Sequence, residues 1–551
     1  IRRDRQGALW ISTSKEGLVR YYGSEFTPIT VEDGLNTNGI EYTYEDFEGS
    51  LWVGTGSGGL NRLRDGRFTT LTRKDGLVDE MVWGVFQTKR GGMWIGTELG
   101  ITHLYRGATK TFTVEEGLAD NVVNAFAEGP DGKVWVGTYN GVSIVGKQVE
   151  QTIGKEDGLP GHDVRSLMPA KKGMWLGIMG GGLVRYDGKI VEAFTKENGL
   201  ISNEVRVVAP GSDGAVWIGT NQGLSYLKDG TIKNYGAEDG VASARVFSVF
   251  AEGPKHVWIG TDKGLLHFDS QKFVQISSRD GLSDDKVYTV LDDGLGYLWM
   301  SSNKGVFRVS KADAKAFIEG KSKKINSTSF GIVDGMRSVE CNVAGSNSGW
   351  RSRAGTLWFA SIAGVAIINP QGSSQNLPPE VVLEKLVVDG RQVQLIDSWV
   401  SPPGVESLRI HYAAPTFIGA GDVRFRYRLK GLSDEWVFAE TLLVAQYAHL
   451  APGRYVFEVQ ALSPDGVESV NPAKFEFYLK PYFYQTKVFY VLWAFLVALV
   501  ALAFHRLRLR HHENQKAYLE ELVFQRTDEL EQANQKLKEL STRDPLTGLR
   551  N

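Results

Sequence analysis

Large polar and aromatic side chains recur at one position of a repeating sequence unit, and their chemistry is that of a ligand-binding surface. Each lies six residues after the last residue of a turn such as Asp33-Gly34-Leu35. The candidate ligand-binding residues are Trp83, Asn124, Arg165, Arg206, Tyr288 and Asn342. Arginine forks suit carboxylates and aromatic faces allow stacking, so the set favours a polar or anionic ligand. The alternative is a solvated rim of loops that binds nothing.

The unit that carries these residues is marked by a tryptophan. Eight tryptophans follow one another at spacings of 40 to 42 residues, and Trp358 comes after a longer gap; the eight are Trp10, Trp52, Trp94, Trp135, Trp175, Trp217, Trp258 and Trp299. Each unit contains four short β-rich stretches separated by turns. One such sheet cannot bury both faces alone, so the units predict the blades of a β-propeller with the tryptophans in the blade cores. The first strand of a blade lies nearest the axis, which places the candidate binding residues around one end of the channel.

The composition excludes several classes of protein. Of 551 residues, 42% are hydrophobic and 64 are glycines without a three-residue period, which excludes general disorder and collagen. The net charge of −2 gives no bias toward nucleic acid. The 9 histidines and the single Cys341 form no evident metal spacing or catalytic pair, so we assign no catalytic residue, no metal and no cofactor to this chain. A propeller enzyme that cleaves polysaccharide stays a third hypothesis, because propeller sites assemble from distant blades.

The pattern changes after residue 370. Residues 371–379 are rich in Gly, Ser, Gln and Pro and predict a linker, and the alternating strands of 380–480 predict a β-sandwich. A charge-free stretch follows, and we assign 486–504 to a transmembrane helix. Basic residues come directly after it, so the positive-inside rule places the propeller and sandwich in the periplasm and the C-terminus in the cytoplasm.

Residues 505–541 predict a cytoplasmic coiled-coil helix that forms a homodimer. Leu519, Arg526, Ala533 and Leu540 repeat every seven residues and alternate with a second apolar series. The predicted dimer seam consists of Leu519, Val523, Leu530, Leu537 and Leu540. A change of register or pitch in this seam would carry a signal from the periplasm.

Several motifs resemble known sensor families. The run Gly132-Lys133-Val134-Trp135-Val136-Gly137-Thr138 is similar to the repeats of two-component regulator propellers, and Phe425-Arg426-Tyr427-Arg428-Leu429 resembles the YYY domain that follows them. The resemblance implies a seven-bladed ring over 80–370 and makes 1–79 the end of a preceding propeller. A single ring of eight or nine blades is the alternative. The implied ligand is a periplasmic small molecule or glycan.

The last residues indicate what the helix controls. Residues 542–551, which contain Arg543-Asp544-Pro545-Leu546-Thr547-Gly548-Leu549, resemble the opening of a GGDEF domain. The resemblance implies a diguanylate cyclase that makes cyclic di-GMP from GTP with Mg²⁺, in a protein of which this chain is a fragment. The expected protein is therefore a receptor of the bacterial inner membrane that regulates a cyclase. The alternative is a sensor histidine kinase, for which His511-His512-Glu513 is a superficial match.

Overall fold

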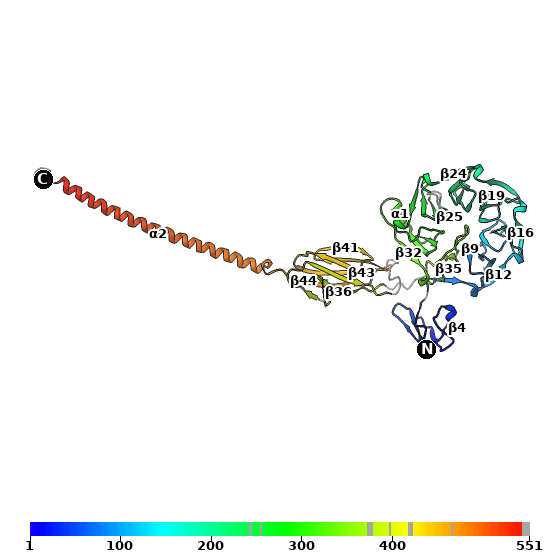
Figure 1. The fold of residues 1–551 in the computed structure, drawn as a ribbon, viewed down its shortest axis with the longest axis horizontal. Coiled ribbons are helices and arrows are strands. Elements are labelled where there is room, and N and C mark those ends of the chain that lie inside the picture. Colours follow the sequence, from blue (N-terminus) through cyan, green and yellow to red (C-terminus); the bar gives the residue numbers. More distant parts are fainter. Residues whose placement is uncertain are drawn as a thin grey trace. The chain divides into compact units, whose positions relative to one another are not determined.

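The computed structural model describes residues 1–551 except 65, 242–244, 254–255, 372–377, 396–397, 417–422, 464–466 and 543–551. The described residues form two compact units, Ile1–Leu377 and Pro378–Asn551. The first contains the repeats and the second contains a β-sandwich and a long helix (Figure 1). The predicted linker lies largely outside the described residues.

Six blades of a ring in the first unit are four-stranded antiparallel sheets made from consecutive strands. The first three are β9–β12 (Val82–Gln87, Met93–Thr97, Ile101–Tyr105, Ala108–Phe112), β13–β16 (Val123–Glu128, Val134–Thr138, Gly141–Val145, Val149–Ile153) and β17–β20 (Val164–Pro169, Met174–Ile178, Gly182–Tyr186, Ile190–Phe194). The next three are β21–β24 (Val205–Pro210, Val216–Thr220, Gly223–Lys228, Thr231–Tyr235), β25–β28 (Val246–Glu252, His256–Thr261, Gly264–Phe268, Phe273–Ile276) and β29–β32 (Thr289–Asp292, Tyr297–Ser302, Gly305–Ser310, Ser327–Phe330). Helix α1 (Lys311–Ile318) lies between β31 and β32 and explains why the repeat period breaks there.

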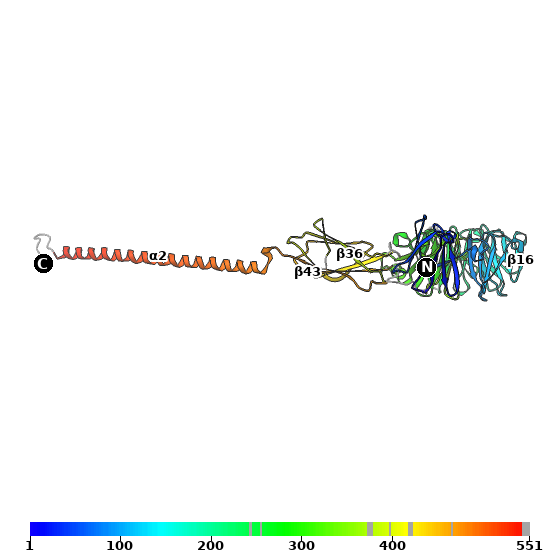
Figure 2. The same ribbon diagram turned by 90° about the horizontal axis from the view of Figure 1, so that it is seen from below.

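The seventh blade closes the ring with a strand from the other end of the repeat region. It pairs β33 (Gly349–Arg351), β34 (Leu357–Ser361) and β35 (Gly364–Ile368) with β8 (Phe68–Leu71), in the register Val365 to Leu71. The first strand of each blade contacts the first strands of both neighbours, and β33 contacts β9, so the seven blades form a closed circle, which Figure 1 shows face-on and Figure 2 from its edge. The predicted seven-bladed propeller is confirmed, and the alternative of eight or nine blades is wrong.

Two further blades precede the ring. Strands β1–β4 (Arg2–Arg3, Leu9–Ser12, Leu18–Tyr22, Glu25–Ile29) form a four-stranded sheet, and β5–β7 (Ile40–Glu45, Leu51–Thr55, Leu60–Leu63) form a three-stranded one. The sequence places β8 as the fourth strand of the second sheet, within segment 1–79. Ring closure uses β8 instead, because the last blade of the ring would otherwise lack its outer strand.

The two sequence markers have clear structural roles. The acidic-Gly turn is a short 3-10 helix such as Val31–Asp33, in which Thr30 and Asp33 cap each other and Gly34 adopts φ +105°. The indole nitrogen of Trp299, which is 1% exposed, donates to Asp293 at 2.9 Å, and Trp10 donates to Asp4 in the same way. The tryptophans therefore serve the blade cores, as the sequence predicts.

The second unit begins with the β-sandwich. One sheet has the order β37-β36-β39-β42 (Arg391–Val393, Val382–Val388, Ser407–Ala413, Val444–Ala448), and the other has β38-β44-β43-β40-β41 (Ser398–Val400, Ala473–Leu479, Gly453–Leu462, Arg424–Lys430, Ser433–Glu440). Tyr412, Phe425 and Phe457 lie in the core between them.

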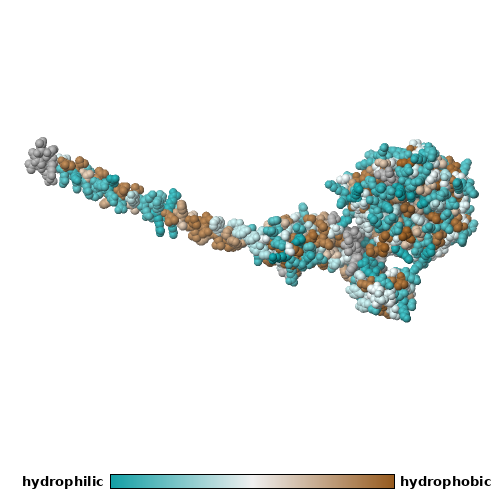
Figure 3. Space-filling view, in the orientation of Figure 1, coloured by the Kyte–Doolittle hydropathy of each residue, from teal (hydrophilic) through white to brown (hydrophobic). Residues whose placement is uncertain are grey.

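A 3-10 turn, Phe483–Gln485, leads into helix α2, which runs without a break over Lys487–Ser541. The helix contains a window with a mean hydropathy of 2.3 and no buried residue, long and apolar enough to cross a membrane. Figure 3 shows this apolar part as a brown band on the end of the helix next to the sandwich.

Candidate functional site: the axial rim of the propeller

Each candidate binding residue of the first four blades lies at a β-bulge in the strand nearest the ring axis. The pairing of β9 with β10 skips Trp83, and the next three blades skip Asn124, Arg165 and Arg206 in the same way. Phe247 is skipped in the fifth blade. A bulge leaves one residue out of the ladder and redirects its side chain. We call this ring of positions, completed by Tyr288 and Asn342, the axial rim.

One part of the rim is held by a shared carboxylate. Asp163 is 7% exposed and accepts hydrogen bonds from Asn124 at 2.9 Å and from Arg165 Nε at 2.8 Å. A second guanidinium nitrogen of Arg165 lies 2.7 Å from Asp163. Asn124 is 1% exposed, so its amide is fully enclosed. Both residues therefore have their polar groups satisfied within the protein.

A segment of the last blade covers the same part of the rim. Residues 344–348, which we call the plug segment, directly precede β33 in the last blade. Ala344 accepts from Arg165 at 3.1 Å, and Ser346 donates to the Arg165 carbonyl at 3.1 Å. Asn347 accepts from the backbone of Val85 through its carbonyl and from Phe126 through its side chain, both at 2.8 Å. The plug segment thus satisfies backbone groups on β9, β13 and β17.

Asn342 and Trp83 lie where the last blade meets the first. The side-chain amide of Asn342 donates to the Val82 carbonyl at 2.8 Å, beside the bulge at Trp83. The indole nitrogen of Trp83 is buried, and it has no hydrogen-bond partner within the described part of the chain. Asn342 is 7% exposed. Its position indicates a role in closing the ring.

The rim differs at β21 and β25. Arg206 donates from Nε to the side-chain oxygen of Asn221, and the Asn221 amide donates to Glu204. The Arg206 guanidinium carbon lies 5.5 Å from the centre of the Phe247 ring. Burial and the neighbouring Arg165 and Arg245 charges lower the pKa of Arg206. A partly buried arginine faces an aromatic ring here, and the charges of Arg165, Arg245, Glu204 and Asp163 all act on it.

Tyr288 and Arg245 complete this side. The Tyr288 hydroxyl donates to Asn303 at 2.8 Å, and burial raises its pKa. Its ring meets that of Phe247 edge to face at 5.3 Å. Arg245 lies 3.8 Å from Asp262, and its side chain is 60% exposed. The described side chains contain no group of three His, Cys, Asp or Glu residues that could hold a metal.

The structure therefore places the candidate residues in one rim, where they form two groups with different partners. Asn124 and Arg165 are linked by Asp163, whereas Arg206 reaches Tyr288 through Phe247. The sequence interpretation missed Asp163, Asn221 and Arg245. Asp163 and Arg245 lie two residues before the rim position of their blade, and this second irregular column is a signal that could have identified them.

Two family models match the chain. The model described as Two component regulator propeller matches residues 117–140 and 199–222, and the model of the Y_Y_Y domain matches residues 416–480. The chain carries two-component regulator propeller repeats and a Y_Y_Y domain. With one helix among the described residues that is apolar and long enough to cross a membrane, it has the composition of a membrane sensor of the two-component regulator type.

Two relatives resemble parts of this chain. Histidine kinase P4 of Formosa agariphila is 27% identical over 227 residues, which are 38% of this chain and 16% of that protein. A solved extracellular domain from B. thetaiotaomicron, named for a hybrid two component system, superposes with a TM-score of 0.65 at 22% identity. That match covers 87% of this chain and 67% of the other, and it shows a common fold.

Proposed function

We propose that this chain is the sensing and relay part of a dimeric receptor of the bacterial inner membrane. In this proposal the propeller binds a ligand in the periplasm at the axial rim. Helix α2 crosses the membrane and pairs with α2 of a second copy in the cytoplasm. The observation that carries the proposal is that α2 continues from the apolar segment into the heptad seam without interruption.

The continuity matters because it couples the two ends mechanically. A helix of 55 residues is about 80 Å long at 1.5 Å per residue, more than the ~30 Å of a bilayer core. A rotation or shift at Lys487 is therefore transmitted to the seam beyond the membrane. The aromatic residues Tyr482, Phe483 and Tyr484, which are exposed just before the helix, suit the membrane interface.

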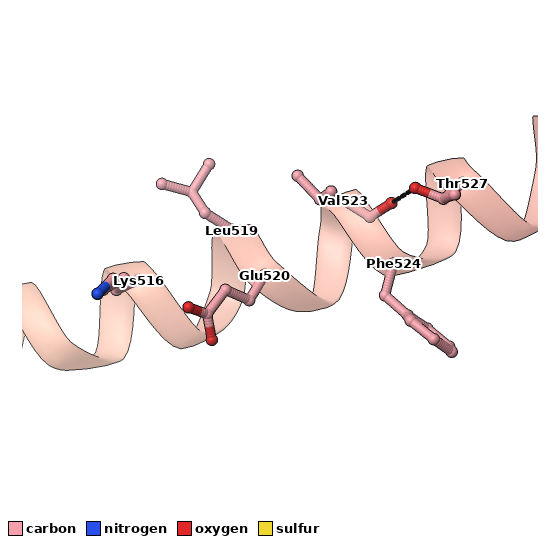
Figure 4. Close-up of a pocket in the computed structure, with 6 residues that line it drawn as sticks. All are labelled: Lys516, Leu519, Glu520, Val523, Phe524 and Thr527. Atoms are coloured by element: carbon pink, nitrogen blue, oxygen red, sulfur yellow. Dashed lines mark hydrogen bonds between the residues drawn. The ribbon is translucent and has the colours of Figure 1, made fainter.

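The seam is exposed on the lone helix. Figure 4 shows Leu519 and Val523 on one side and Phe524 on the opposite side. All five seam residues are exposed, and Leu530 and Leu537 are each 63% exposed. Apolar side chains at heptad spacing are stabilised when a second helix covers them, and a second copy of α2 offers the matching surface.

The output proposed is a diguanylate cyclase, on the resemblance of residues 543–551 to a GGDEF opening. Those residues lie outside the described part of the chain, and Mg²⁺ and GTP would be bound by the cyclase. A histidine kinase is the second candidate, because the curated relative is named as one. In cells that express the natural gene, accumulation of cyclic di-GMP supports the cyclase, and ³²P transfer from ATP to a histidine of the protein supports the kinase.

Cysteine labelling tests the topology. Cys341 is 2% exposed and burial raises its pKa to about 12, so the natural thiol should not react. A membrane-impermeant maleimide should label Ser57→Cys in cells with a permeabilised outer membrane, and Gln515→Cys only after lysis. Labelling of Gln515→Cys before lysis would contradict the topology.

Cross-linking tests the dimer. Oxidation should join two copies through Leu530→Cys in the seam, and Asp528→Cys on the opposite face serves as the matched control. Equal cross-linking of both variants would show that the seam is not the interface.

A further inference from the structure

Two arginines occupy the same bulge position in neighbouring blades, yet only one has a counter-charge. Arg165 forms an ion pair with Asp163. Arg206 has no carboxylate within ion-pair distance among the residues that the structure describes. We infer that Arg206 binds an oxyanion group of the sensor's ligand, so that the binding site is the rim at β21 and β25 alone. This inference rests on the proposed function of the propeller as the ligand-binding part.

The free hydrogen-bond donors of Arg206 support this assignment. Its Nε donates to Asn221, and within the described residues neither terminal nitrogen has a hydrogen-bond partner. Two parallel N–H groups from a guanidinium match the two oxygens of a carboxylate, sulfate or phosphate. Asn221 fixes the near end of the guanidinium, so the free end is already oriented.

The surroundings favour an anion over a neutral ligand. The charges of Arg165 and Arg245 act on Arg206, although each of these two arginines is paired with its own carboxylate, Asp163 and Asp262. The nearest acids are engaged elsewhere, since Glu204 accepts from Asn221 and Asp163 accepts from Arg165. A partly buried cation without a carboxylate partner costs free energy, and a bound oxyanion would offset that cost.

The plug segment explains why the site is confined to this part of the rim. Its hydrogen bonds reach β9, β13 and β17, where they occupy the Arg165 carbonyl and the Val85 and Phe126 amides. No hydrogen bond of the plug segment to β21 or β25 occurs among the described residues. Among the described residues, the plug segment therefore forms hydrogen bonds beside Arg165 and none beside Arg206.

The contrast between the two arginines provides the experiment. The full chain, purified in detergent, is compared as wild type, Arg206→Gln and the matched control Arg165→Gln. Melting temperatures are measured in sodium chloride, sodium sulfate and sodium acetate at equal ionic strength. Sulfate raises the Tm of most proteins by exclusion from the surface, so only its difference between variants is informative.

In chloride we expect Arg206→Gln to melt higher than wild type and Arg165→Gln to melt lower. We expect sulfate or acetate to raise the Tm of wild type by about 2 °C more than that of Arg206→Gln. A larger shift in sulfate indicates a sulfate- or phosphate-like group on the ligand, and a larger shift in acetate indicates a carboxylate. Equal anion-dependent shifts in wild type and Arg206→Gln would overturn the inference.

A cellular assay separates this inference from the proposed function. If Arg206→Gln cells keep the full response to a stimulus of the wild type, the sensor stands and the assigned site is wrong. If Arg206→Gln loses anion binding but altered seam variants leave the output unchanged, the site stands and the relay through α2 is wrong.

Discussion

Both halves of the axial rim have a β-bulge at the rim position, but the side chains at these bulges have different partners. At β13 and β17, Asn124 and Arg165 are joined by Asp163 and covered by the plug segment. At β21 and β25, Arg206 and Phe247 take the same bulge positions, and among the described residues Arg206 has no carboxylate partner and neither residue has a hydrogen bond to the plug segment. We call these halves the plugged arc and the open arc.

The difference separates residues that hold the ring together from residues that can meet a ligand. A polar side chain whose donors are all satisfied inside the protein contributes to stability, and it has little left to offer a ligand. A half-buried cation with free donors does the opposite, since it costs stability until something binds. Arginine at a rim position is thus insufficient to identify a binding site.

The largest loss of stability is expected from adding a methyl group where the plug segment packs against the rim. In Gly345→Ala, the new Cβ would lie 1.7 Å from the Arg165 carbonyl oxygen and 3.0 Å from that of Asn124. Because backbone cannot yield as a flexible side chain does, we expect a loss of about 3 kcal/mol in the free energy of unfolding. Urea unfolding followed by tryptophan fluorescence measures it.

Gly154→Ala is the matched control, because its Cβ would meet nothing within 4 Å. Its effect should stay within about 0.5 kcal/mol. Similar stability of the two variants would show that the plug segment is not seated against the rim in solution.

The next largest loss of stability is expected from neutralising the acidic residue of the plugged arc, and the matching acidic residue of the open arc serves as its comparison. Asp163→Asn removes the charge that pairs with Arg165 and disturbs the hydrogen bond from Asn124, and we expect a loss of about 2 kcal/mol. Glu204→Gln alters the corresponding residue of the next blade, which is exposed, and should cost about 0.5 kcal/mol or less. Equal losses in thermal or urea unfolding would remove the distinction between the arcs.

Acid should loosen a blade of the open arc selectively. His267 is 4% exposed and packs on Trp258, and burial lowers its pKa to about 4. The unfolded chain binds a proton near pH 6.5 and the folded chain does not, so stability falls as the pH drops from about 6.5 toward 4. Between pH 7.5 and 5.5 we expect a loss of about 1 kcal/mol.

Hydrogen exchange at the two pH values checks this expectation. After correction for the intrinsic exchange rates, β26 and β27 should lose more protection than β18 and β19, where Arg185 instead of histidine packs on Trp175. His267→Gln should abolish the difference. Uniform loss of protection in both blades would argue that another group senses the acid.

The sequence predicted the rim but not its division. The column from Trp83 to Asn342 was visible because the repeat period is strict, and the blade cores followed from the tryptophans. The partners were not visible, because Asn124 meets Asp163 39 residues away and Phe126 meets Asn347 221 residues away. The sequence alone cannot distinguish Arg165 from Arg206, because the two residues occupy the same position of the repeat.

What the sequence determined by itself is local and periodic: four-stranded blades, capped turns, buried tryptophans, an apolar helix segment and a heptad. Each depends on contacts within about one repeat, so a single unit already contains the information. Only the tertiary structure decided that β8 leaves its own repeat to close the ring, and that the plug segment of the last blade lies over one arc of the rim. Both outcomes depend on closing a circle, which brings together residues that no local pattern connects.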